Sequence, residues 1–312
     1  MVSGIDPSAA QFLADLAQTQ ARMNTAQRQV SSGLKFQDAS DAPDQVSDIL
    51  SLRADISRNT QVQSNLGNVK TQVDAAEQAV SNAEQLVEQA RTLAAQGLTG
   101  TQTAQTRNAL AQQVQAIHDQ LISLANSQVG NWYVFGGDAP QSAPYAADTN
   151  NPDAGGGVVQ QTTVQATRQI QDPLGNTFTV DLTAQQIFDD QNPDGTPTSN
   201  NVFVAINQLR VALQSNDVDA IQSSLDAVTQ ADDFLNNQLG FYGAAQNRVS
   251  AATNLAQNLA LDYQTALSDK QDADLTQAIT ELNQTQIQEQ ATLQARAQMP
   301  RTSLFDYLRS GG

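Results

Sequence analysis

Apolar residues recur every three or four positions over two long stretches of the chain, and a stretch with a different pattern separates them. The most regular run extends from residue 66 to residue 94 and predicts one helix packed lengthwise against other helices. With the residues before it, this helix would cover 44–96, a rod of about 80 Å at 1.5 Å per residue. Gly97 and Gly100 end it. Its apolar seam comprises Leu66, Val69, Val73, Ala76, Val80, Ala83, Val87, Ala90 and Ala94.

Two shorter periodic stretches flank this helix. The first begins at Asp6-Pro7, where an N-cap acceptor precedes a proline suited to the first helical position, and it ends at Gly33. The second follows a short loop rich in Thr and Gly. The short loop predicts that this return helix lies antiparallel to the long one. The apolar positions of the return helix are Leu110, Val114, Ile117, Leu121 and Leu124.

Between residues 140 and 200 the pattern changes. This stretch holds six of the nine prolines. Apolar and polar residues alternate over Val158–Val164 and Asn176–Leu182, which predicts short antiparallel strands, and a brief helix should follow Thr183. Helical periodicity returns at Asn201 and continues to residue 239. We expect one further long helix from Gly243 to about residue 298.

The order of these elements predicts a mainly α fold. Neither helical half carries a complete core, so the N- and C-terminal halves should pair into one long antiparallel bundle, a coiled-coil rod. A small β-rich insert would project from its far end. The seam near the C-terminus is sparse, because Lys270, Gln286 and Glu289 interrupt it. A helix pair with such a seam is marginal alone, so we expect neighbouring molecules to stabilise it.

Composition narrows the functional classes. The chain has 32 acidic and 15 basic residues, and its formal charge of −17 disfavours a nucleic-acid partner. The absence of cysteine excludes disulfides and thiolate metal sites, and the single histidine, His118, excludes any site that needs two imidazoles. The sequence lacks both an apolar run of about 18 residues and a cleavable secretory signal. We therefore expect no enzyme activity, no cofactor and no membrane partner.

Two candidate chemical sites have simpler structural explanations. The run Asp190-x-Asn192-x-Asp194-Gly195 copies the first half of an EF-hand calcium loop, but its twelfth position is Asn201 instead of the required bidentate Glu. We interpret it as a turn-rich loop. His118 lies off the apolar seam of the return helix, which favours a solvated or partly packed side chain.

Two further clusters are also more easily explained as structural. Asp272 and Asp274 could pair their carboxylates for acid–base chemistry, but on an exposed helix face such residues are usually solvated. The aromatic residues Trp132, Tyr133 and Phe135 could form a ligand platform. Their flanking glycines and the valine between them favour a buried cap on the end of the rod. The sequence contains no His-Glu-x-x-His zinc-protease motif.

Three segments resemble bacterial flagellins and their hook-associated relatives. Gln29–Asp41 (QVSSGLKFQDASD) resembles the start of these proteins, and Arg107–Ile117 (RNALAQQVQAI) resembles their return helix. Gly243–Val249 (GAAQNRV) is similar to the family's turn into its last long helix. The three segments occur in the family's order, and the resemblance covers about residues 8–140 and 200–310 while leaving the insert uncovered.

Within the family, the resemblance favours a subunit of the junction between hook and filament. Ser31-Ser32-Gly33-Leu34 is more similar to filament flagellin, which remains the alternative. A coiled-coil surface adhesin that binds glycans through the insert is a second alternative, outside the family. The segments that favour the junction are Asp41-Ala-Pro-Asp44, Leu124–Asn126 with Gly130–Gly137, and Pro300–Leu308.

The resemblance also implies how such a subunit is built and delivered. Residues 1–40 and 268–312 would be terminal axial helices, 41–139 and 201–267 a helical rod domain, and 140–200 a β-rich surface insert. The chain would be exported unfolded through the flagellar type III channel, without a cleaved signal peptide, into the extracellular flagellum. Its partners would be copies of itself in a ring or tube, another hook-associated protein on the hook side and flagellin on the filament side. An export chaperone is a further candidate partner.

Two groups of apolar side chains would carry this assembly. The first would contact neighbouring subunits through the terminal helices, and the second would form the core of the rod. The first group is Phe12, Leu16, Met23, Val30, Leu275, Ile279, Leu282, Leu304, Phe305 and Leu308. The second group is Val73, Val80, Val87, Val114 and Leu121.

Overall fold

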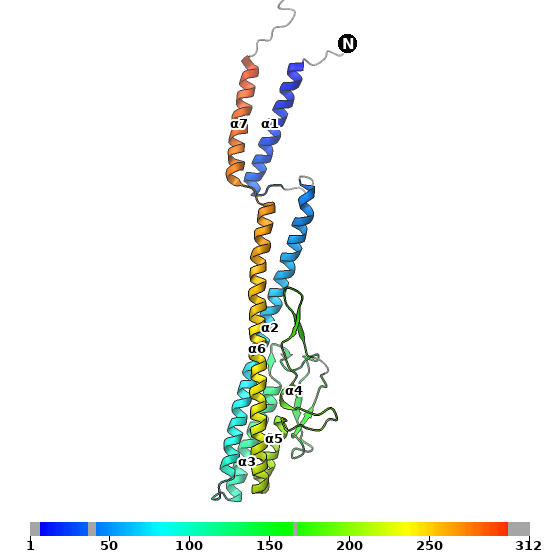
Figure 1. The fold of residues 1–312 in the computed structure, drawn as a ribbon, viewed down its shortest axis with the longest axis vertical. Helices are drawn as coiled ribbons and strands as arrows, with labels where there is room; N and C mark the ends of the chain where they lie inside the picture. Colours follow the sequence, from blue (N-terminus) through cyan, green and yellow to red (C-terminus); the bar gives the residue numbers. More distant parts are fainter. Residues whose placement is uncertain (1–6, 37–41, 165–166, 299–312) are drawn as a thin grey trace, which may run out of the picture. The chain divides into compact units, whose positions relative to one another are not determined.

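The computed structural model describes residues 7–36, 42–164 and 167–298, and it divides into two compact units (Figure 1). The terminal unit comprises the described residues of 1–58 and 260–312, and the central unit those of 59–259. Helices α2 (Pro43–Gly97) and α6 (Val218–Gln271) contribute residues to both units. The expected division into terminal helices, rod domain and insert remains a prediction. Asp6, the expected first cap, lies outside the described residues.

The mainly α fold is confirmed. α1 ends where predicted, because Gly33 adopts the left-handed conformation with φ +74°. Thr103 begins α3 through a capping box with Thr106. α4 is the brief helix expected after Thr183. Besides α2 and α6, the helices are α1 (Pro7–Ser32), α3 (Ala104–Ala125), α4 (Ala184–Phe188), α5 (Val202–Ser215) and α7 (Leu275–Gln298).

The expected helix start at Gly243 is wrong. α6 begins at Val218 and passes through Gly240 and Gly243 without a break. Each helical glycine costs about 1 kcal/mol relative to alanine. The fully buried Tyr242 between them offsets that cost, because burying a large aromatic side chain contributes about 2–3 kcal/mol.

The expected continuity up to residue 298 is also wrong, because the helix stops at Gln271 and α7 starts after Asp274. The Asp274 carboxylate accepts the backbone N–H of Gln277 at 3.0 Å and so caps α7. Asp272 accepts the hydroxyl of Ser268 at 2.5 Å. These two aspartates serve the helix ends and do not form a carboxylate pair.

Within the described residues, six short strands form three separate antiparallel pairs, β1 with β2, β3 with β4 and β5 with β6. The expected strands at 158–164 and 176–182 exist as β4 and β6, although each is only three residues long. Sequence patterning did not predict the other four. The strands are β1 (Gln128–Val129), β2 (Trp132–Tyr133), β3 (Tyr145–Ala147), β4 (Val158–Gln160), β5 (Gln169–Gln171) and β6 (Thr177–Thr179).

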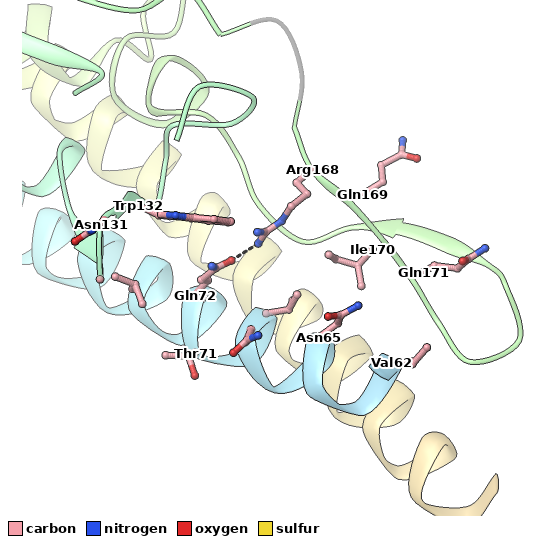
Figure 2. Close-up of a pocket in the computed structure, with 14 residues that line it drawn as sticks. Val62, Asn65, Thr71, Gln72, Asn131, Trp132, Arg168, Gln169, Ile170 and Gln171 are labelled. Atoms are coloured by element: carbon pink, nitrogen blue, oxygen red, sulfur yellow. Dashed lines mark hydrogen bonds between the residues drawn. The ribbon is translucent and has the colours of Figure 1, made fainter. Parts of the chain in front are cut away.

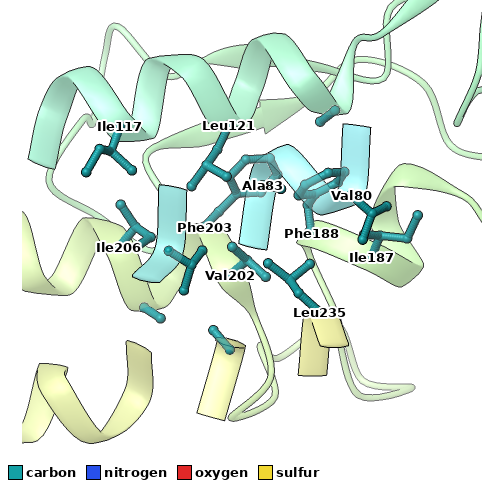
Figure 3. Close-up of a cluster of buried hydrophobic side chains, with 14 of the residues drawn as sticks. Val80, Ala83, Ile117, Leu121, Ile187, Phe188, Val202, Phe203, Ile206 and Leu235 are labelled. Carbon is teal, nitrogen blue, oxygen red and sulfur yellow. The ribbon is translucent and has the colours of Figure 1, made fainter. Parts of the chain in front are cut away.

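The large apolar core lies in the central unit (Figure 3). All nine residues of the predicted α2 seam are buried, which confirms the packing face of that helix. In α3, Leu124 is half-buried and the other four predicted apolar residues are buried. α3 packs closely against α5, which joins the N-terminal and C-terminal halves of the chain.

The insert packs along these helices and does not project from their far end. Phe135, Tyr145 and Phe188 are all buried in the helical core. Tyr145 and Phe188 gather around Phe203 of α5, whose ring centroid lies 5.2 Å from that of Tyr145 and 5.8 Å from that of Phe188, and Phe135 packs edge-on against Phe188. Burying such rings contributes about 2–3 kcal/mol each, so these side chains anchor the insert to the bundle.

Candidate functional site

Helices α1 and α7 of the terminal unit form an antiparallel pair (Figure 1). Arg22 Nη2 lies 2.6 Å from Glu281 Oε1, and Gln20 Nε2 donates to Glu289 Oε1 at 3.1 Å. Exposed contacts of this kind contribute at most about 1 kcal/mol each. The stability of the pair therefore depends on how much apolar surface it buries.

The terminal unit buries very little apolar surface. Among its described residues, the only buried apolar side chains are Ala26, Ile49 and Ala278. Two of the three are alanines, which bury little area and contribute correspondingly little. The pair thus lacks the apolar burial that normally stabilises an isolated helix pair. The half-buried apolar seam residues are Phe12, Leu16, Met23, Val30 and Leu282.

Large apolar side chains remain exposed on the same unit. Leu275 and Ile279 are each 47% exposed, Leu293 is 49% exposed, and all three fall on one face of α7. We call these three residues the α7 lane. Apolar surface left open in this way is typical of contact surfaces. Of the eleven large apolar side chains exposed within the described residues, seven belong to the terminal unit: Leu13, Leu50, Leu261, Leu275, Ile279, Ile287 and Leu293.

The structure separates the expected subunit-contact residues into two groups. Those of α1, with Leu282, lie in the seam between the two helices, whereas Leu275 and Ile279 face solvent. Leu304, Phe305 and Leu308 lie outside the described residues. A role in assembly remains a prediction for all of them. Sequence reasoning missed Leu13, Ile287 and Leu293, because their exposure depends on which face of each helix meets its partner.

The expected rod-core residues lie together in the central unit. Val80, Val87, Val114 and Leu121 have no exposed surface, and Val73 is 2% exposed. All five belong to one apolar cluster that joins α2, α3, α5 and α6.

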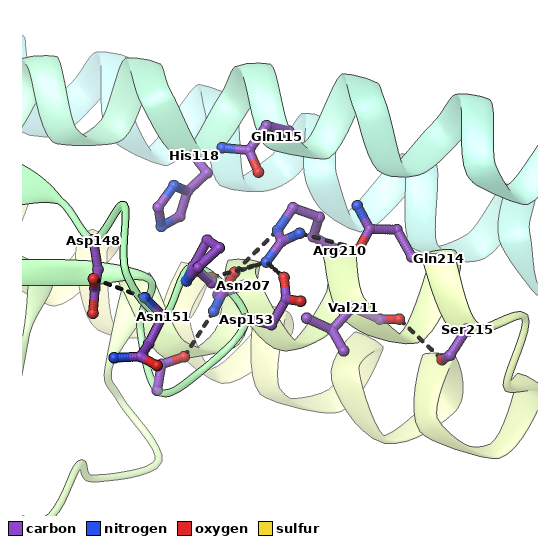
Figure 4. Close-up of polar contacts among 12 residues, drawn as sticks. Gln115, His118, Asp148, Asn151, Asp153, Asn207, Arg210, Val211, Gln214 and Ser215 are labelled. Atoms are coloured by element: carbon purple, nitrogen blue, oxygen red, sulfur yellow. Dashed lines mark hydrogen bonds and ion pairs between the residues drawn. The ribbon is translucent and has the colours of Figure 1, made fainter.

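A buried polar network fixes the loop of residues 148–157 to α5 (Figure 4). Arg210 is buried, and its Nη2 donates to Asp153 Oδ1 at 2.6 Å and to the Pro152 carbonyl at 2.9 Å. Its Nε donates to Asn207 Oδ1 at 3.0 Å. Gly157, with φ +64°, is required here, because a Cβ would lie 2.9 Å from the Pro152 oxygen.

His118 is buried, so the expectation of a solvated or partly packed side chain is wrong. It is 2% exposed, its Nε2 lies 2.7 Å from the Gly156 carbonyl oxygen, and its ring packs edge-on to Phe203. Nδ1 has no hydrogen-bond partner in the described chain, although Asp119 Oδ1 is 3.8 Å away. Burial lowers the pKa of His118, and the charge of Arg210 adds to this effect. The Gly156 hydrogen bond and Asp119 oppose that lowering of the pKa.

We expect His118 to make the protein less stable in mild acid. Its pKa in the folded state lies below the ordinary value of 6.5, so the unfolded chain binds the proton more readily. The contribution of neutral, buried His118 to the free energy of unfolding is therefore complete above pH 6.5. It is lost as the pH falls from 6.5 toward the pKa of the folded state. The measurement is urea unfolding at several pH values for wild type and His118→Gln. The difference between the two free energies of unfolding should shrink toward acid, and a difference independent of pH would contradict this.

The other candidate chemical sites are accounted for by local structure. Asp190 accepts hydrogen bonds from Thr198 and Asn200, and Asp194 accepts them from Thr196. The described residues contain no cluster of three or more His, Cys, Asp or Glu side chains that could hold a metal ion. Of the described helices, none has the length and apolar character needed to cross a membrane.

Comparison with known families accounts for most of the helical chain. Residues 7–137 match the bacterial flagellin N-terminal helical region, and residues 225–308 match the bacterial flagellin C-terminal helical region. The chain therefore belongs to the bacterial flagellin family.

Within that family, two curated relatives are both flagellar hook-associated protein 3. The Escherichia coli K12 protein is 25% identical over 64% of this chain and 65% of its own length. The alignment thus spans slightly less than two thirds of that relative. The Salmonella typhimurium LT2 protein is 27% identical over 65% of this chain and 67% of its own length.

Solved structures share the fold at lower sequence identity. A putative flagellar hook-associated protein from Vibrio parahaemolyticus matches 74% of this chain and all of its own with a TM-score of 0.63 and 22% identity. Flagellar hook-associated protein 3 from Legionella pneumophila matches 71% of this chain and 98% of its own with a TM-score of 0.59 and 14% identity.

Proposed function

We propose that the chain is a structural subunit of the bacterial flagellum that joins the hook to the filament. The observation that carries this proposal is the terminal unit, which pairs two helices with almost no apolar core and exposes seven large apolar side chains. Such a unit gains most of its stability from neighbouring molecules. The names of its curated relatives support the junction as the place where those neighbours are found.

The proposed assembly begins with an unfolded chain. It passes through the flagellar export channel to the extracellular end of the hook without a cleaved signal, and the central unit then folds around its own core. The terminal helices complete their burial against copies of the chain, a second hook-associated protein on the hook side and flagellin on the filament side. The subunit acts through packing alone, without catalysis or a cofactor.

Filament flagellin is the alternative within the family, and a coiled-coil adhesin is the alternative outside it. Both curated relatives are hook-associated proteins, which favours the junction over the filament. The match of both terminal helical regions to the flagellin family disfavours an unrelated adhesin.

Deletion of the gene tests the proposal. Electron microscopy should show hooks without filaments, and flagellin should accumulate in the culture medium because exported subunits have nothing to attach to. Complementation with the full chain should restore the filaments. Cells that keep normal filaments after deletion would rule out the junction role, and loss of flagellin itself from the medium would favour the filament alternative.

We expect the terminal helices to be sensitive to protease in the dilute monomer. Trypsin should cut quickly at the exposed Arg22 and Arg28 of α1, because little apolar burial holds that helix. The buried Arg107 and Arg210 of the central unit should resist cleavage. Mass spectrometry should find a core that begins between residues 38 and 58 and ends before about residue 290. An intact N-terminus after digestion would instead favour a fully folded adhesin.

A further inference from the structure

A groove in the central unit has a lining unlike the rest of this acidic chain (Figure 2). It lies between one face of α2, the β1–β2 hairpin and the β5 strand, and its volume is about 970 Å³. The chain has 32 acidic residues, yet none lines the groove. The lining of the groove includes apolar side chains and six residues with amide side chains, of which Gln169 and Gln171 point away from α2 (Figure 2): Asn65, Asn68, Gln72, Asn131, Gln169 and Gln171.

Trp132 forms one wall of this groove, so the expectation that it would be a buried cap is wrong. Its side chain is 47% exposed and has no hydrogen-bond partner among the described residues, whereas Phe135 is fully buried. The hairpin pairs Val129 with Trp132 across a two-residue turn that begins at Gly130, with φ +63°. The Ser127 carbonyl accepts the backbone N–H of residue 134 at 2.9 Å, so the hairpin holds the indole on a fixed backbone.

Arg168 lies opposite the indole and is already held in place (Figure 2). Its Nη2 donates to the side-chain oxygen of Gln72, and its Nε lies 3.8 Å from Asp181 Oδ2. Asp181 thus balances much of the guanidinium charge, while Nη1 has no hydrogen-bond partner within the described chain. The exposed amides of Asn68 and Asn131 also make no side-chain hydrogen bonds to described residues.

We propose that this groove binds a short neutral oligosaccharide. A hexose ring has an apolar C–H face that can pack on an exposed indole, and hydroxyl groups around its edge that both donate and accept hydrogen bonds. Amide side chains also donate and accept, so the unpaired amides of Asn68 and Asn131 suit hydroxyl groups better than they suit a single charge. The volume lies within the range of small-ligand sites, from about 300 to 1,000 Å³.

The groove fits other classes of ligand less well. A divalent cation would need carboxylate oxygens, which the lining lacks. A nucleic acid would meet one partly neutralised cation on a chain with a charge of −17. A second copy of the chain would need roughly 800 Å² on each partner for a stable interface, and docking there would bury amides that need partners.

The chain offers a direct probe, because Trp132 is its only tryptophan. Titration of the full-length monomer with maltotetraose, cellotetraose and chitotetraose should produce a saturable change in tryptophan fluorescence with at least one of them. Tetragalacturonate should bind more weakly, because the negative chain repels it. No saturable change up to roughly 10 mM with any neutral sugar would overturn the proposal. A spectral change that depends on protein concentration without sugar would overturn it in favour of a second copy.

Variants separate the groove from general effects on folding. Asn68→Ala and Asn131→Ala each remove one exposed amide of the groove, and each should weaken sugar binding about fivefold. Trp132→Ala, followed by calorimetry, should weaken it by about tenfold or more. Gln113→Ala removes an exposed amide of α3 outside the groove and should leave affinity unchanged. Equal affinity in all four variants, with wild-type circular dichroism, would remove the groove as the site.

Discussion

Replacing Val80 by aspartate should lower the free energy of unfolding by about 4 kcal/mol or more. Val80 has no exposed surface and lies in the apolar cluster near Ile187 of α4 (Figure 3). The new carboxylate would be buried among apolar side chains, where an unpaired charge costs far more than the lost valine contacts. Urea unfolding followed by circular dichroism measures the change.

A matched control on the same helix distinguishes this effect from a loss of helix propensity. Gln78 is exposed on α2, so Gln78→Asp introduces the same side chain into water and should cost less than about 1 kcal/mol. Both changes should leave export intact, because the proposed export acts on the unfolded chain. A Val80→Asp protein with the unfolding midpoint of the wild type would place residue 80 outside the core.

The sequence predicted the α2 seam well because nine apolar positions follow one another without interruption. A run from Leu66 to Ala94 at constant spacing leaves only one helix face that can be buried. The same logic identified the buried face of α3. Local turn chemistry was equally informative at Gly33 and Thr183, where a single residue type satisfies a strict backbone or capping requirement.

Long-range packing could not be predicted from local patterns. Phe135, Tyr145 and Phe188 belong to separate short segments with no common period, so only the fold reveals that Tyr145 and Phe188 meet at Phe203 and that Phe135 packs on Phe188. The burial of His118 also depends on the 148–157 loop, a segment distant from α3 in the sequence whose Gly156 carbonyl contacts the imidazole. Trp132 and Phe135 are three residues apart, yet the hairpin turns one to solvent and the other to the core.

For the terminal unit, in contrast, the sequence did predict the packing. Its interrupted seam predicted a weak helix pair, and the structure leaves the α7 lane open to solvent. These exposed side chains add no burial energy to the monomer. Exposed leucine or isoleucine instead favours association with other molecules. The lane is therefore the part of the described surface where a small change should separate folding from assembly.

We expect the double variant Leu275→Asp/Ile279→Asp to fold and be exported normally but to leave hooks without filaments. Both side chains are 47% exposed, and at residue 275 the new aspartate falls in the first turn of α7, where a negative charge is favourable, so the free energy of unfolding should change by less than about 1 kcal/mol. In an assembled ring each subunit would lose about 1.5–3 kcal/mol per buried side chain and would also bury two charges. Cells that lack the native chain and carry the variant would be examined by electron microscopy, with exported protein measured by immunoblot.

Gln284→Asp/Gln288→Asp places the same two charges four residues apart on a different face of α7 and should leave filaments intact. Filaments of normal number on cells with the lane variant, at equal export, would show that subunits do not meet through this face of α7.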